Sequence, residues 1–160
     1  MKYFAVFFMI FALCGALKAE YKTEYKAVDG DSLVRGDERI RLRGIDAPEL
    51  VQQCRDEYGA DYACGQEAFE FLQNLMKGNN VSCKCLKKRD RYKRKLCECF
   101  VSNISLNHEM VASGYAISYK SKRYLQAEES ARSHKYGLWR GKFMRPAIYR
   151  ALERESAKLP

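Results

Sequence analysis

Two Cys-x-Cys pairs, Cys83/Cys85 and Cys97/Cys99, constrain the fold of this chain more than any other feature of its sequence. In an antiparallel hairpin, one register places Cys83 opposite Cys99 and Cys85 opposite Cys97. Directly opposite residues lie roughly 4.5–5.5 Å apart, which is within disulfide reach. The spacing therefore predicts a hairpin over residues 81–101 that is closed by two bridges.

Neighbouring residues agree with this register. It brings together residues of similar hydrophobicity or opposite charge on each face of the hairpin. The predicted cross-strand pairs are Val81 with Val101, Lys84 with Glu98, and Leu86 with Leu96.

The cysteine count also bears on the compartment. Lys2 is followed by an apolar run over residues 3–17 and then small residues, which is typical of a secretory signal cleaved after residue 19. The run is shorter than the roughly 20 residues of a membrane span, so an uncleaved anchor is the weaker alternative. Without Cys14, six cysteines remain, and an even number in an exported chain favours disulfides, with Cys54–Cys64 as the third. A four-thiolate zinc site is the competing interpretation, although Cys-x-Cys spacing is unusual for it.

Charge indicates the kind of partner. The net charge is +9 over 160 residues, and the predicted signal removes two lysines and no acid. Such an excess favours a polyanion as partner, such as nucleic acid, anionic lipid or a cell-wall polymer, whereas the alternative is charge that only keeps the protein soluble.

The length of the chain excludes a large multidomain protein. We expect one domain over residues 20–160, with a basic tail from about residue 140, in a periplasmic or extracellular location.

Hydrophobic periodicity predicts strands, then a helix, a hairpin and further helices. This order indicates an α+β fold around a small barrel or curled sheet. The expected strands are 21–28, one from Ser32, and 38–45; a long loop covers 48–64; the helices are 66–77, 106–113 and 123–136; and Pro146 begins a short helix in the tail.

Three carboxylates near the second and third strands are the first candidates for chemistry. Asp31, Asp46 and Glu49 offer the hard oxygen atoms that Ca²⁺ and Mg²⁺ prefer, although Asp-Gly turns and loop carboxylates are common without any metal. Arg41 is suited either to a bidentate grip on phosphate or to an exposed strand position. Most residues from 87 to 95 are basic, so sequence spacing does not single out Arg94 among them.

Three longer motifs carry a resemblance to a known family. D-G-D-S at 29–32, R-L-R-G-I-D-A-P-E at 41–49 and D-R-Y-K-R at 90–94 resemble the staphylococcal nuclease (thermonuclease) family. C-G-Q-E-A at 64–68 and K-Y-G-L-W at 135–139 extend the similarity. The resemblance covers about residues 25–139, nearly the whole expected domain.

The resemblance implies an OB-fold five-stranded β-barrel with three helices and a Ca²⁺-dependent phosphodiesterase site. By matching positions, the implied metal ligands are Asp31, Asp46 and the backbone carbonyl of Ala47, where many members have Thr. Glu49 corresponds to the proposed general base, and Arg41 and Arg94 correspond to the phosphate-binding arginines. The sequence departs from the family around Arg94, where Lys93 and Lys95 stand in place of two flexible glycines.

The expected substrates are DNA and RNA, cleaved at the 5′ P–O bond to leave 3′-phosphates. Because a basic surface contacts phosphates in any sequence, little base selectivity is expected. Tyr92 and Tyr119 match nucleotide-holding tyrosines of the family, and we expect Arg91 to bind substrate beside them. Because exposed tyrosines can stack on unpaired bases, we expect the protein to prefer single-stranded or frayed substrates. We expect a monomer without stable membrane association once the signal is cleaved. The main rival is a non-catalytic nucleic-acid-binding or polyanion-binding module on the same barrel.

Overall fold

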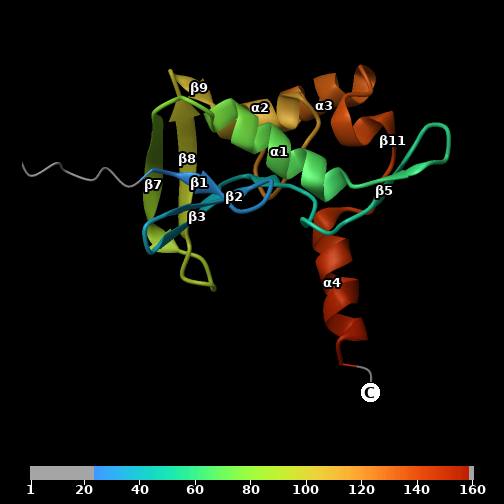
Figure 1. The fold of residues 1–160 in the computed structure, drawn as a ribbon, viewed down its shortest axis with the longest axis horizontal. Coiled ribbons are helices and arrows are strands. Elements are labelled where there is room, and N and C mark those ends of the chain that lie inside the picture. Colours follow the sequence, from blue (N-terminus) through green and yellow to red (C-terminus); the bar gives the residue numbers. More distant parts are fainter. Residues whose placement is uncertain (1–23, 159–160) are drawn as a thin grey trace, which may run out of the picture.

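The computed structural model describes residues 24–158, so the predicted signal over residues 1–19 lies outside the described residues. The elements follow the predicted order of strands, helix, hairpin and helices (Figure 1). The strands are β1 (Lys26–Ala27), β2 (Ser32–Arg35), β3 (Glu38–Leu42), β4 (Ile45–Asp46), β5 (Cys54–Asp56), β6 (Asp61–Tyr62), β7 (Val81–Arg89), β8 (Lys95–Val101), β9 (Ile104–Ser105), β10 (Ile117–Ser118) and β11 (Gly141–Lys142). The helices are α1 (Cys64–Met76), α2 (Leu106–Ala112), α3 (Leu125–Ser133), the 3-10 helix η1 (Gly137–Arg140) and α4 (Pro146–Ser156).

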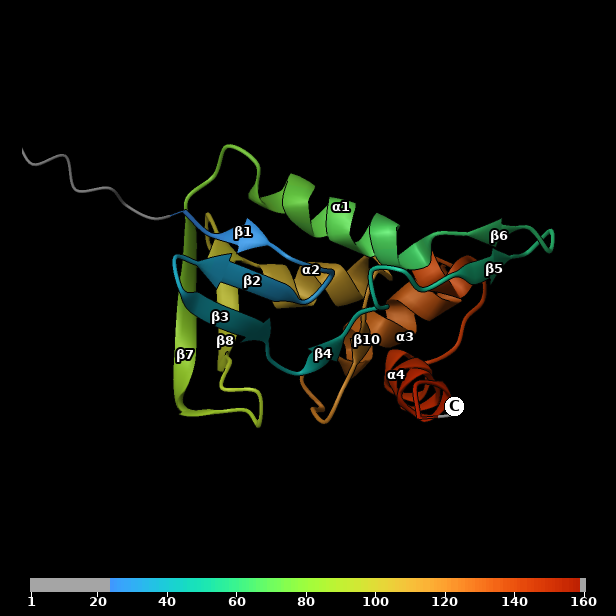
Figure 2. The same cartoon turned by 60° about the horizontal axis from the view of Figure 1, so that its bottom comes forward.

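One curled sheet dominates the molecule (Figure 2). Five of its strands follow the path β1-β2-β3-β8-β7, and β9 pairs with β8. All these pairs are antiparallel except β3 with β8, which is parallel. A separate short pair, β4 with β10, continues from the end of β3 (Figure 2). The α+β architecture is that of a small OB-like barrel, as the sequence predicts.

Disulfides close the hairpin formed by β7 and β8. Cys83 pairs with Cys99, Cys85 pairs with Cys97, and a third bridge joins Cys54 to Cys64. The predicted register holds from Val81 to Cys85 and then shifts, so that Arg89 stands opposite Lys95. The predicted pairing of Leu86 with Leu96 is therefore wrong.

The core lies between the sheet and the first two helices. Alternate residues of β3, Ile40 and Leu42, point into it because strand side chains alternate between faces. Helix α1 lies alongside β1 and β2 (Figure 2) and buries one stripe, Ala68 and Leu72, at helical spacing. A smaller cluster forms around the Cys54–Cys64 bridge with Ile117 and Leu138.

The structure corrects several predicted boundaries. The expected loop 48–64 contains the short antiparallel pair β5–β6, and the strand 38–45 is interrupted after Leu42 by a turn at Gly44, whose φ is 83°. The predicted tail helix does begin at Pro146 and forms α4 over eleven residues, so within residues 24–158 it adds a fourth α-helix to the three that the family resemblance implies. Helix α4 stands out from the body of the molecule (Figure 1). None of the helices in the described part of the chain has the length and hydropathy that crossing a membrane requires.

Candidate functional site

The two aspartates of the predicted site meet at Arg41. Asp31 is held by two hydrogen bonds: within the turn before β2 its N–H donates to Asp29 Oδ1 at 2.9 Å, and its Oδ2 accepts from the N–H of Ala47, which follows β4, at 2.8 Å. Arg41 projects from the face of β3 opposite the core, where Nη1 contacts Asp31 Oδ1 and Nη2 lies 2.6 Å from Asp46 Oδ1. The guanidinium thus lies between the two carboxylates and is not the exposed group that one interpretation of the sequence allowed.

Burial gives these carboxylates unusual properties. Asp31 and Asp46 are almost completely buried. Burial raises the pKa of Asp31 to about 7, against the opposing charge of Arg41. Although burial works the other way, the charges of Asp31 and Asp46 raise the pKa of Arg41 above its ordinary value. The ionised form of Asp31 therefore depends on cations close to it.

Glu49 is held by its own loop and by the start of α1. Gln52, which is fully buried, donates its backbone N–H to the Glu49 carbonyl at 2.7 Å and accepts the Glu49 N–H at 3.3 Å through its side-chain oxygen. The loop also packs on Gly65, where an added Cβ would lie 1.8 Å from the Glu49 carbonyl oxygen. A glycine is needed there because no side chain fits between the helix and the loop.

Arg150 of α4 is a site residue that the sequence analysis missed. Its Nη1 lies 2.7 Å from Glu49 Oε1, and its Nη2 lies 3.0 and 3.1 Å from the two oxygens of Asp46. These partners raise the pKa of Arg150, although burial acts in the opposite direction. The only hint in the sequence was Pro146, which begins a helix and so places Arg150 one turn into it.

The hairpin turn supplies Arg94. Asp90 Oδ1 accepts the backbone N–H groups of Tyr92 and Arg94, each at 2.9 Å, and Asp90 Oδ2 pairs with Arg94 Nε at 2.8 Å. Partial burial would raise the pKa of Asp90, but the hydrogen bonds from Arg94 lower it. Arg94 Nη1 then reaches Ser32 Oγ at 3.4 Å, and that hydroxyl donates to Asp31 Oδ1 at 3.2 Å.

These contacts join into one polar network. It runs from Arg94 through Ser32, Asp31, Arg41, Asp46 and Arg150 to Glu49. The five charged side chains predicted from the sequence all belong to it, with Ser32 and Arg150 as added members. Residues from the strands, the hairpin turn, the loop before β5 and α4 thus meet in one place.

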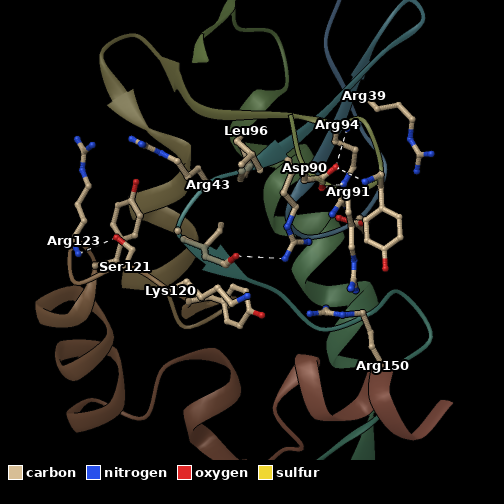
Figure 3. A pocket seen from close by; sticks show the side chains of 18 of the residues that line it. Arg39, Arg43, Asp90, Arg91, Arg94, Leu96, Lys120, Ser121, Arg123 and Arg150 are labelled. Atoms are coloured by element: carbon tan, nitrogen blue, oxygen red, sulfur yellow. Dashed lines mark hydrogen bonds and ion pairs between the residues drawn. The ribbon is translucent and has the colours of Figure 1, made fainter. Parts of the chain in front are cut away.

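A cavity of about 1040 Å³ opens over this network (Figure 3). Arg91 and Arg94 approach it from the hairpin turn and Arg150 approaches from α4, whereas Arg43 and Arg123 lie on the opposite side (Figure 3). The predicted substrate-binding residues Tyr92, Arg91 and Tyr119 line it as well. Tyr92 is exposed, with Arg91 and Arg94 stacked 4.8 and 5.4 Å from its ring centre.

Asp31 and Asp46 present carboxylate oxygens to one positive charge, that of Arg41. Within residues 24–158, no group of three or more His, Cys, Asp or Glu side chains is gathered as a metal cluster, and Arg41 and Arg150 form ion pairs with the carboxylates. A guanidinium that contacts both Asp31 and Asp46 nevertheless shows that these two can share one positive charge. Carboxylate oxygens are donors of the type that Ca²⁺ takes.

Known proteins are similar to this chain over most of its sequence. A family model described as staphylococcal nuclease homologue matches residues 39–141. The succinoglycan biosynthesis protein ExoI of Rhizobium meliloti is 34% identical over 117 residues, which cover 71% of this chain and 61% of that protein. An uncharacterized endonuclease of Haemophilus influenzae is 36% identical over 123 residues, covering 71% and 63%. The probable endonuclease LCL3 of Phaeosphaeria nodorum is 32% identical over 148 residues, covering 82% and 47%.

This chain spans between about half and two thirds of the length of these relatives. The matched range contains four of the seven residues of the polar network, and Asp31 and Ser32 lie before it. The four are Arg41, Asp46, Glu49 and Arg94. Helix α4 and Arg150 lie beyond the matched range. From this match and the fold together, the chain belongs to the family of staphylococcal nuclease homologues.

Proposed function

We propose that this protein is an exported, Ca²⁺-dependent nuclease that hydrolyses DNA and RNA with little sequence specificity. The observation that carries the proposal is the single polar network that joins Asp31, Arg41, Asp46, Glu49 and Arg94 beneath a basic cavity. Two relatives whose names include endonuclease support it.

Each residue of the network has a role in this reaction. Glu49 accepts a proton from a water molecule, whose oxygen then forms a bond to phosphorus in line with the 5′ oxygen. The P–O5′ bond breaks, the 5′ oxygen takes a proton from solvent, and the 3′ end keeps the phosphate. Arg41 and Arg94 line the cavity, and each donates N–H groups to phosphate oxygens as negative charge grows on them.

The metal role falls to Asp31, Asp46 and the carbonyl of Ala47. When bound there, Ca²⁺ supplies a Lewis acid that offsets charge on a phosphoryl oxygen. Asp31 and Ala47 already share a hydrogen bond of 2.8 Å, which fixes the carboxylate against the backbone that follows β4. The raised pKa of Asp31 and the nearby charge of Asp29 mean that a cation stabilises this group of acids.

The residues that line the cavity support nucleic acid as the substrate. Tyr92 and Tyr119 offer aromatic faces to unpaired bases, and Arg91 offers a phosphate contact that is indifferent to sequence. A single-stranded or frayed strand is preferred because its bases are free to stack.

The protein acts as a monomer without membrane association. Three disulfides support an oxidising compartment, either periplasmic or extracellular.

The test is a cleavage assay on supercoiled plasmid and on a single-stranded oligonucleotide. Purified protein with Ca²⁺ is expected to degrade both, faster for the single strand, and EGTA is expected to stop the reaction. A salt-sensitive gel shift without cleavage would contradict the proposal and identify the rival, a non-catalytic binding module on the same barrel.

A further inference from the structure

Helix α4 is attached to the molecule almost entirely at its first turn. Pro146 is its one buried residue, whereas Ile148 and Leu152 are about half exposed. Just before the helix, the Met144 carbonyl accepts a hydrogen bond of 2.8 Å from the side chain of Gln52. Within residues 24–158, the other polar side-chain contact between α4 and the body is made by Arg150, whose guanidinium contacts Asp46 and Glu49.

Arg150 and Gln52 hold the Glu49 loop from two sides. Gln52 fixes the backbone of Glu49 and, through Met144, ties that loop to the start of α4. Arg150 fixes the carboxylate itself, with one guanidinium nitrogen on Glu49 and the other on Asp46. The loop that carries the general base is thus coupled to α4 through both backbone and side chain.

Electrostatics explains why a cation is needed between these acids. Asp46 is fully buried and Glu49 is one third exposed, so their mutual repulsion is only partly screened by water. A fork of two N–H donors offsets this repulsion and sets the orientation of both carboxylates at once.

Resting on the proposed function, we propose that Arg150 is a positioning residue of the active site, supplied by α4, which holds the Glu49 carboxylate beside Asp46 in the geometry that accepts a proton from water. Every hydrogen bond that the Arg150 guanidinium makes in the described part of the chain goes to these two acids. Its role is therefore to orient protein groups, in contrast to Arg94, which also faces the exposed Tyr92 and the hairpin rim.

Two other roles make different predictions. If Arg150 gripped a substrate phosphate, its loss would weaken oligonucleotide binding and reduce the salt dependence of that binding by about one phosphate contact. If it were an inhibitory plug that neutralised Glu49, its loss would raise the turnover rate. A positioning role predicts neither change.

The experiment compares Arg150→Ala and Arg150→Lys with the matched control Arg154→Ala in the full chain. Arg154 lies one turn further along α4, is exposed, and forms no ion pair within residues 24–158. We measure kcat and KM on a single-stranded oligonucleotide, the affinity for that oligonucleotide in EGTA at several salt concentrations, hydrogen exchange of residues 47–53 in EGTA, and the thermal midpoint.

For Arg150→Ala we expect kcat to fall about 10- to 100-fold, the range typical of losing an outer partner that orients a metal ligand, as Arg150 would orient Asp46. Affinity in EGTA and its salt dependence stay unchanged, and hydrogen exchange in residues 47–53 becomes faster. Arg150→Lys retains the positive charge but lacks the two parallel N–H donors, so its kcat lies between that of the wild type and that of Arg150→Ala. Arg154→Ala matches the wild type in all four measurements.

Unchanged kcat, raised kcat, or weakened binding in EGTA would each overturn the positioning role while leaving the nuclease proposal intact, because the wild type still cleaves. A wild type that fails to cleave would overturn both. The thermal midpoint and Arg150→Lys separate a lost function from a lost fold.

Discussion

The hairpin β7–β8 and helix α4 each bring an arginine to the same cavity, but the protein holds them in different ways. Arg94 lies on a turn closed by Asp90, at the end of a hairpin whose two strands are joined by two disulfides. Arg150 stands on a helix that is mostly exposed, and its position depends on the ion pairs that it makes with Asp46 and Glu49.

This difference shows two ways of supplying a cation to an active site. The hairpin fixes Arg94 through the disulfide-closed strands and through Asp90, a residue of its own turn, so the position of Arg94 does not depend on Asp46 or Glu49. The position of Arg150 is coupled to the charge on these two acids, because the acids themselves hold it. Loss of Arg94 should therefore remove a contact with substrate, whereas loss of Arg150 should release the Glu49 loop.

Replacing Arg94 with Ala should give the largest effect on activity. Removing one preorganised donor to transition-state charge costs about 10²- to 10³-fold in kcat. Steady-state kinetics on an oligonucleotide measure this, with Lys88→Ala as the control, since Lys88 is exposed on β7 and does not line the cavity. A rise in KM with unchanged kcat would show that Arg94 only binds substrate.

Removing both hairpin disulfides should be the next largest change. With all four cysteines replaced by Ala, the free energy of unfolding should fall by about 2–5 kcal/mol, because the unfolded chain is no longer constrained. Urea denaturation followed by circular dichroism measures the loss. A change below about 0.5 kcal/mol would show that Asp90 and the core fix the hairpin without the bridges.

Ile148→Ala on α4 should have the smallest effect. A half-exposed residue away from the core changes stability by no more than about 0.5 kcal/mol. The comparison is Leu72→Ala in α1, which is fully buried and should cost about 2–5 kcal/mol. Thermal denaturation of both variants is the measurement. An equal loss in the two would mean that α4 is covered in solution and is held as firmly as the hairpin.

The hairpin also shows how far sequence reasoning reached. The register was correct as far as the cysteines define it, because two disulfides fix which residues face each other. Beyond Cys85, the hydrogen bonds of Asp90 set the turn instead, and β7 accommodates two more residues than β8 before Arg89 meets Lys95. No cross-strand pattern in the sequence indicated that the register would shift before the Asp90 turn.

The site residues also fall into those that the sequence predicted and one that it did not. Asp31, Arg41, Asp46, Glu49 and Arg94 were found because they lie in motifs that resemble a family, and the fold brings them into one network. Arg150 lies 101 positions from Glu49 and in no motif. Only the packing of α4 against the Glu49 loop places it there, and that packing depends on tertiary contacts that periodicity does not encode.

The most direct test of the central claim is cleavage of an oligonucleotide in ¹⁸O-labelled water with Ca²⁺, followed by mass spectrometry of the products. If the polar network is one hydrolytic centre, the products carry a 5′-hydroxyl and a 3′-phosphate with one ¹⁸O atom in the phosphate, and EGTA abolishes them. An intact oligonucleotide, or product phosphate without the label, would contradict the account.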